Sequence, residues 1–185
     1  LYCRGLLASS LWRSGEQASA RRYADEVATL IKQARGIPVG YDTIDGYRAV
    51  AEVYLGLWEQ AGAAAPRAVK AAARRACRAL HTYRRFFPIG EAVAWQFQGQ
   101  LEWLAGKPKR AHVAWRRSLA AAERMSMPYE QAEACFQIGR HLPAGHPGRD
   151  PMLQRALATF AHLSAEYDCA CVQAALESSE RATHG

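Results

Sequence analysis

Residues 91–125, EAVAWQFQGQLEWLAGKPKRAHVAWRRSLAAAERM, contain the clearest structural signal in this chain. It contains two helical patterns, separated by a break at Gly106-Lys107-Pro108. Gly99 lies in the first pattern and Ala111 in the second. Small residues at facing positions allow two antiparallel helices to approach closely. The stretch therefore predicts a helical hairpin.

Two tryptophans flank the predicted contact of the hairpin. Trp95 lies four residues before Gly99, and Trp115 lies four residues after Ala111. Large aromatic side chains contribute most to the stability of a fold when they are buried. We expect both tryptophans to be largely buried beside these small residues and against neighbouring helices.

The twelve-residue interval between Gly99 and Ala111 recurs elsewhere in the chain. It separates Ala8 from Ala20, and Gly56 from Ala68, while a fourth unit begins at Pro128 with Gly139 in the small position. Successive small positions are 48, 43 and 40 residues apart, longer than the ~34-residue period of a strict tetratricopeptide repeat (TPR). The repetition predicts an all-α, TPR-like α-solenoid with irregular units.

Proline and glycine clusters divide the chain into expected helical pairs. We expect a single domain, residues 1–185, with antiparallel hairpins at about 1–35, 42–87, 89–126 and 128–164 and a capping helix at about 167–182. The sequence does not begin with Met and is helical in pattern from the outset. We therefore expect it to be part of a longer multidomain protein.

Composition limits the class of protein. Half of the 185 residues are hydrophobic, yet no run reaches the ~18 uncharged apolar residues of a membrane-spanning helix. The five cysteines are odd in number and mostly have apolar neighbours, which favours reduced thiols over a disulfide framework. These features predict a cytoplasmic protein with no membrane partner.

One expected helix, residues 67–87, has a strongly basic side. Residues 67–117 contain twelve Lys or Arg and two Glu, a net charge of +10, whereas the whole chain has +7. Together with His81, five cations recur there every three or four residues; these five, called the basic face, are Arg67, Lys70, Arg74, Arg78 and Arg85. Such a surface suits nucleic acid, an acidic protein or an anionic lipid, but it is also typical of the solvated side of an outer helix.

Residues for catalysis or metal binding are not arranged in a recognisable motif. The sequence has no phosphate-binding glycine loop, nucleophile elbow or H-E-x-x-H motif. His141 and His146 flank a loop that contains Asp150, and Cys169 and Cys171 are two residues apart. Residues two apart on a helix point to different faces, so the cysteines are a poor chelate. We expect no enzymatic activity, no metal and no cofactor in this segment.

Several short motifs carry a resemblance to a known family. They are Phe87-Pro-Ile-Gly90, the hairpin from Trp95 to Trp115, Met127-Pro-Tyr-Glu130 and Ile138-Gly-Arg-His-Leu142. With these motifs, residues 47–167 resemble the C-terminal helical repeat region of bacterial signalling ATPases of the STAND type. Those proteins are often fused to class III adenylate or guanylate cyclase domains or to a protein kinase domain. The resemblance implies a non-catalytic regulatory module, with the catalytic domain upstream.

The preferred interpretation is a protein–protein interaction module in signal transduction, which binds a protein or peptide, including the parent's own ATPase or cyclase domains. By TPR register, the residues of the partner-binding groove (the predicted groove) are Gln96, Gln100, Trp103, Phe136 and Arg140. The alternative is a nucleic-acid- or anionic-ligand-binding helical repeat that uses the basic face. Homo-oligomerisation of the parent protein is a third hypothesis.

Overall fold

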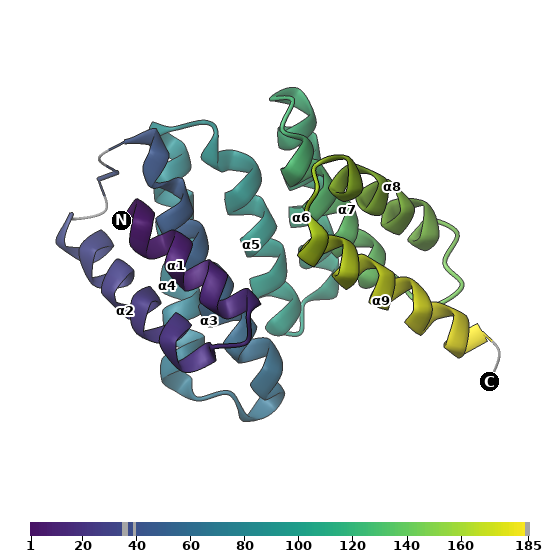
Figure 1. Ribbon diagram of the computed structural model, residues 1–185, viewed down its shortest axis with the longest axis horizontal. Coiled ribbons are helices and arrows are strands. Elements are labelled where there is room, and N and C mark those ends of the chain that lie inside the picture. The colour runs from purple at the N-terminus through teal and green to yellow at the C-terminus, as the bar shows by residue number, and fades with distance from the viewer. Residues whose placement is uncertain (35–36, 39, 184–185) are drawn as a thin grey trace. The chain divides into compact units, whose positions relative to one another are not determined.

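The computed structural model describes residues 1–34, 37–38 and 40–183, with side chains up to residue 177. Within these ranges the regular structure is helical and includes no strand, which confirms the prediction of an all-α chain. The chain forms two compact units, Leu1–Ala111 and His112–Gly185 (Figure 1).

The helices follow one another with short connections. The first unit contains α1 (Tyr2–Arg13), α2 (Gln17–Gln33), η1 (Tyr41–Thr43), α3 (Ile44–Ala61), η2 (Gly62–Ala64), α4 (Arg67–Phe86) and α5 (Gly90–Leu104), where η denotes a short 3-10 helix. The second unit contains α7 (Pro128–Arg140), α8 (Arg149–His162) and α9 (Glu166–Thr183), and α6 (Pro108–Arg124) begins in the first unit and continues in the second. Each expected hairpin range encloses two of these helices, and the expected capping range lies inside α9.

Helix α3 is the central element of the first unit. It packs against α1, α2, α4 and α5, and ten of its eighteen residues are buried. Helix α1 also packs against α2, and α4 also packs against α5 (Figure 1). The hydrophobic core of the unit is therefore built around α3, with the other four helices covering it.

Two glycines permit the close approach of α1 to α3. A Cβ atom on Gly5 would lie 2.6 Å from the Cα of Gly46, so the two backbones meet at this point. Farther along, a Cβ atom on Gly56 would overlap the indole ring of Trp12. A larger side chain at Gly5 would push the two backbones apart, and one at Gly56 would displace the indole ring of Trp12.

The contact of Gly56 corrects one prediction. The twelve-residue interval predicted that Gly56 faces Ala68 in the following helix, but Ala68 is exposed and Gly56 contacts Trp12 of the preceding pair instead. Ala8 and Ala20, by contrast, are both completely buried. In this alanine-rich chain the interval identified several buried small positions, but it misplaced Ala68 and did not identify the partner of Gly56.

The two tryptophans have different environments. Trp115 is completely buried, as predicted. Trp95 is only half-buried and lies against α4, where His81 meets its ring edge-on at 5.0 Å and the Arg84 guanidinium lies 5.0 Å from the ring centroid. Trp95 is therefore covered less completely than Trp115, because its ring lies beneath the polar side chains of His81 and Arg84 at the rim of the α4–α5 contact.

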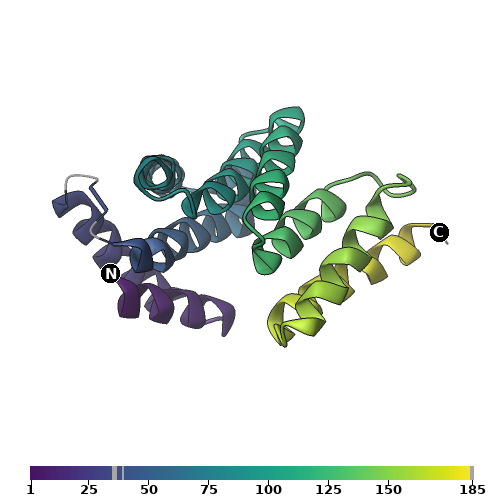
Figure 2. The same ribbon diagram turned by 90° about the horizontal axis from the view of Figure 1, so that it is seen from above.

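In the second unit, α7 packs against α8, and α8 runs beside α9 in both views (Figures 1 and 2). Arg149, which is 9% exposed, begins α8 and connects it to α7 and α9 through hydrogen bonds. Its Nη1 donates to the carbonyl oxygens of Gly139, Arg140 and Leu142 at 3.4, 3.3 and 2.8 Å. Its Nη2 donates to the carbonyl oxygen of Ala175 at 3.2 Å. The guanidinium thus satisfies the carbonyl end of α7 and ties it to α9.

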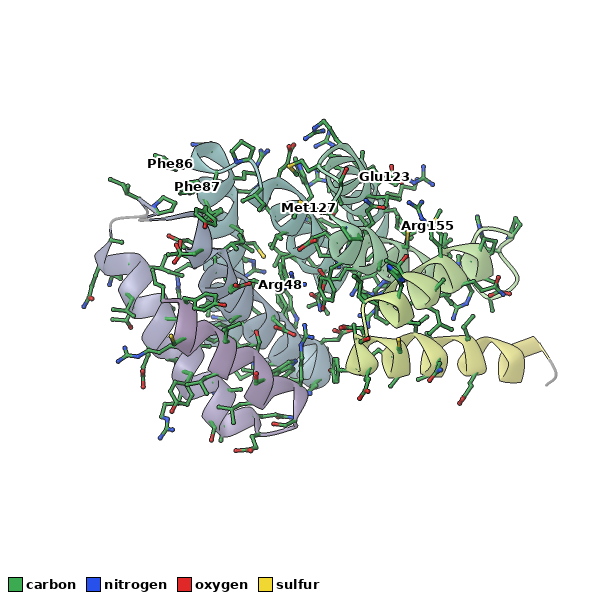
Figure 3. All side chains as sticks on the ribbon, turned by 45° about the horizontal axis from the view of Figure 1, so that its top comes forward. Arg48, Phe86, Phe87, Glu123, Met127 and Arg155 are labelled. Atoms are coloured by element: carbon green, nitrogen blue, oxygen red, sulfur yellow. The ribbon has the colours of Figure 1, made fainter. Side chains whose placement is uncertain are left out.

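A second arginine, Arg155, provides a contrast on the surface. Its Nη2 donates to Glu123 Oε1 at 2.8 Å, and both side chains are close to half-exposed. Figure 3 shows the two labelled side chains near one another, Glu123 from α6 and Arg155 from α8. Exposed ion pairs of this kind contribute about 0–1 kcal/mol.

The glycine contact generates a first prediction. We expect Gly56→Leu to lower the free energy of unfolding by about 1–3 kcal/mol, because the added side chain overlaps Trp12. The control is Ala68→Leu, an exposed position on α4, which should change the free energy by no more than about 0.5 kcal/mol. Chemical denaturation measures both. Equal destabilisation by the two variants would contradict the α1–α3 contact.

The buried guanidinium generates a second prediction. We expect Arg149→Met to cost about 2–4 kcal/mol of unfolding free energy, because it leaves the carbonyl groups at the end of α7 without their charged donor. Arg155→Met, the matched surface control, should cost at most about 1 kcal/mol. Urea denaturation followed by circular dichroism distinguishes them. A loss for Arg149→Met as small as that of the control would refute the role of Arg149.

Candidate functional site

The basic face is one side of α4. Arg67, Arg74, Arg78 and Arg85 are exposed and Lys70 is half-exposed. On the opposite side, the buried residues are Val69, Ala72, Ala73, Ala76, Cys77, Leu80 and Tyr83. Because these side chains pack into the core, the long cationic side chains between them are held on the opposite side of the helix.

Trp58 of α3 underlies two of these cations. The Nζ of Lys70 lies 5.6 Å and the guanidinium carbon of Arg74 lies 5.3 Å from the centroid of the Trp58 ring. Trp58 itself is only 5% exposed. Lys70 Nζ also donates to the carbonyl oxygen of Ala63 at 3.1 Å. The ring face attracts both cations without neutralising their charge.

The charge of the basic face is not compensated by carboxylates. In the part of the chain that the structure describes, none of the five basic-face residues takes part in an ion pair. Two nearby glutamates form ion pairs with other residues. Arg84 Nη1 lies 3.8 Å from Glu91 Oε1, and Lys107 Nζ lies 3.7 Å from Glu102 Oε2. Five cations without counter-ions give this side of α4 a positive potential that attracts anionic groups.

His81 lies beside the basic face but adds no charge at neutral pH. Burial lowers the pKa of its imidazole, and the neighbouring Arg84 lowers it further. Arg84 Nε donates to His81 Nδ1 at 3.0 Å, so this ring nitrogen acts as an acceptor. The positive charge of α4 at neutral pH is therefore carried by its lysine and arginines.

The predicted groove is only partly accessible. Of its three residues on α5, Gln96 is 6% exposed, which is incompatible with a place on an open groove. Gln96 shares its helix face with Ala92 and Gly99, both buried, so the TPR register placed it wrongly. Gln100 and Trp103 are half-buried, and Gln100 Nε2 donates to Glu59 Oε2 at 3.1 Å.

The other two residues of the predicted groove belong to the second unit. Phe136 and Arg140 both lie on α7 and are half-buried. The guanidinium carbon of Arg140 lies 5.4 Å from the centroid of the Phe136 ring. The two side chains cover one another, so this part of the prediction describes an intrahelical cation–π pair.

Helices α1 and α3 share polar contacts that sequence reasoning missed. Glu52 accepts hydrogen bonds from Ser9 Oγ at 2.7 Å and from Arg13 Nε at 3.0 Å. Beside them, a pocket of about 260 Å³ is lined by Leu6, Ser9, Ser10, Arg13, Asp45 and Arg48, the last labelled in Figure 3. The only local signal was the spacing of Asp45, Arg48 and Glu52 on one side of α3. Their partners lie about forty residues away in the chain.

The histidines and cysteines do not form a metal centre in the described residues, where no group of three or more His, Cys, Asp or Glu could hold an ion. The five cysteines are free thiols. His141 stacks on Trp115, with ring centroids 4.6 Å apart and an angle of 16° between the planes. His146 Nδ1 instead accepts a hydrogen bond from the backbone N–H of Gly148 at 3.0 Å.

The stacked imidazole of His141 is held neutral. Burial lowers its pKa to about 3, and the charge of Arg140 contributes in the same direction. His141 Nδ1 lies 2.9 Å from the carbonyl oxygen of Gln137, which fixes the orientation of the ring. The stack is a structural element of the second unit and depends on the uncharged form.

Comparison of the chain with protein-family models, curated proteins and solved structures gives no match. The resemblance to the repeat region of STAND-type ATPases stays a prediction from sequence. In the described residues, no helix combines the length and the apolar character that crossing a membrane requires.

The neutral histidine generates a third prediction, for the dependence of stability on pH. Between pH about 6.5 and 3 the unfolded state binds a proton at His141 that the folded state does not. The free energy of unfolding should therefore fall as the pH falls, by up to about 1.4 kcal/mol per unit from this residue. His141→Phe keeps a ring against Trp115 and removes the titration.

The measurement is chemical denaturation of both proteins at several pH values from neutral to mildly acidic. The stability of the original chain relative to His141→Phe should decrease as the pH falls. Carboxylates and the other histidines titrate in both proteins, so their effects cancel in this difference. A difference that does not change with pH would contradict a buried neutral His141.

Proposed function

We propose that this chain is a non-catalytic protein-docking module that binds an acidic segment of a partner protein along the basic face. The observation that carries the proposal is the absence of any ion pair at the five basic-face residues within the described structure. Two of these cations are also positioned by the ring of Trp58. A partner carboxylate would meet cations that need not first release an internal counter-ion.

The proposal includes a TPR-like architecture. Within the first unit, α1, α3 and α5 are the first helices of successive expected pairs, and α1 contacts α3 while α3 contacts α5. Each of α1 and α3 also packs against the helix that follows it. This order of contacts supports a helical repeat, a class whose exposed helices commonly bind other proteins.

A regulatory setting is the second part of the proposal. The family resemblance suggests an arm of a cytoplasmic bacterial signalling ATPase, with the parent's own ATPase or cyclase domains among the candidate partners. The motifs that carry it have structural roles: a Cβ atom on Gly90 would press against the ring of Tyr83, and Pro128 begins α7. They support a scaffold and supply no catalytic group.

Nucleic acid is the alternative ligand for the same cations. Sequence-tolerant binding of single strands uses aromatic rings on which bases stack. Trp58, the aromatic residue beneath Lys70 and Arg74, is covered by these two side chains and is 5% exposed. Its ring face is already occupied by cations, and this favours an acidic protein over a stacked base.

The fourth prediction tests the docking surface. A fluorescein-labelled peptide of alternating Glu and Leu should bind the chain, and the double substitution Arg74→Glu with Arg78→Glu should weaken its affinity at least about tenfold. Fluorescence anisotropy measures both affinities. The double substitution should cost no more than about 1 kcal/mol of folding stability, since these side chains are exposed.

The matched control is Lys109→Glu with Arg110→Glu, which changes the net charge equally at exposed positions in α6. The affinity of this variant for the peptide should stay within about threefold of that of the original chain, because attraction by net charge alone is a small effect at physiological salt. Equal weakening by both double variants would refute a site on α4. Tighter binding of a single-stranded RNA than of the peptide, with a steep loss of affinity as salt increases, would favour the nucleic-acid alternative.

A further inference from the structure

A pocket of about 660 Å³ lies between α2, α3 and α4, inside the first unit. Its volume falls in the range of sites that bind small molecules, about 300–1,000 Å³. The residues that line it are Asp25, Ala28, Thr29, Ile31, Lys32, Val50, Tyr54, Ala72, Arg75, Ala76 and Ala79. None of them belongs to the basic face, so the pocket is a separate feature of α4.

The pocket is hollow because α4 presents alanines toward α2. Ala72, Ala76 and Ala79 recur at three- and four-residue intervals, and so lie on one side of the helix. Helices α2 and α4 both pack against α3, and methyl side chains are too short to fill the space that remains between them. Ile31 and Val50 add branched aliphatic surface to the lining. The walls suit an alkyl group.

Some polar groups that line the pocket already have hydrogen-bond partners within the protein. Asp25 accepts a hydrogen bond from the Tyr54 hydroxyl group, so its carboxylate already has a donor. Burial raises the pKa of the Tyr54 hydroxyl and the bond to Asp25 raises it further, which keeps this donor protonated. Thr29 Oγ1 donates to the carbonyl oxygen of Asp25 at 2.9 Å.

The two cationic side chains that line the pocket are available to bind an anionic group. Arg75 and Lys32 are exposed, and among the described residues neither side chain has a hydrogen bond or an ion pair. With one carboxylate and two cations, the lining has a net charge of +1. An anionic group at the mouth of the pocket would therefore gain two cationic partners.

We propose that this pocket binds a medium-chain aliphatic carboxylate, with its alkyl chain along Ala72, Ala76 and Ala79 and its carboxylate at Arg75. A guanidinium presents two parallel N–H groups that match the two oxygens of a carboxylate. Lys32 supplies a second positive charge from the opposite helix, α2. The pocket thereby gives the module a small-molecule ligand in addition to its protein partner.

The experiment uses decanoate as the probe, below the concentration at which it forms micelles, with isothermal titration calorimetry as the readout. Decanamide and decylammonium, which have the same alkyl chain with a neutral or a positive head, test the role of charge. Decanoate should bind at least about tenfold more tightly than either. Arg75→Gln should remove that preference, whereas Arg78→Gln, an exposed arginine on the basic face one turn along α4, should retain it.

A second variant tests the alkyl site independently of charge. Ala79→Trp fills part of the pocket and should weaken decanoate and decanamide alike, by about tenfold or more. No decanoate binding at roughly millimolar concentration, equal affinity for decylammonium, or unchanged affinity in Arg75→Gln would each overturn the proposal. The acidic peptide binds a different side of α4, so either proposal can fail while the other holds.

Discussion

The close approach of α1 to α3 is the contact on which the rest of the first unit depends. It requires glycine at two places: Gly5 meets the backbone of Gly46, and Gly56 leaves room for the indole of Trp12. Helix α3 in turn contacts α2, α4 and α5, so its position determines where each of them packs. The orientation of α4 and the space between α4 and α2 both follow from this arrangement.

Helix α4 combines a core face with two different surfaces because of its composition. Its buried residues are three alanines with Val69, Cys77, Leu80 and Tyr83, which bring the helix close to α3 and α5 and direct the long cationic side chains outward. Two of these alanines, Ala72 and Ala76, together with Ala79 are too small to reach α2, and the pocket results. Arginine is suited to both surfaces, since it stays charged and binds carboxylates through two N–H groups.

Much of the fold could be predicted from the sequence, because helix ends and amphipathic faces are local properties. The breaks around Gly62 and Gly106 and the buried side of residues 67–87 needed only periodicity and turn chemistry. The contact of Gly56 with Trp12 and the burial of Gln96 could not be predicted, since alanine and glycine fit several helix pairings equally well. Likewise, the bonds of Ser9 and Arg13 to Glu52 join residues about forty positions apart. The pocket depends on space that side chains do not fill, for which a sequence has no direct signal.

The exposed cations of α4 are proposed to bind an acidic partner. The most direct test is a heteronuclear NMR titration of the isotopically labelled chain with the Glu-Leu peptide. We expect the side-chain guanidinium and backbone signals of residues 67–85 to shift most, together with the indole N–H of Trp58 beneath Lys70 and Arg74. Shifts concentrated on α1 and on Glu52 of α3, with α4 unaffected, would show that the peptide does not bind α4.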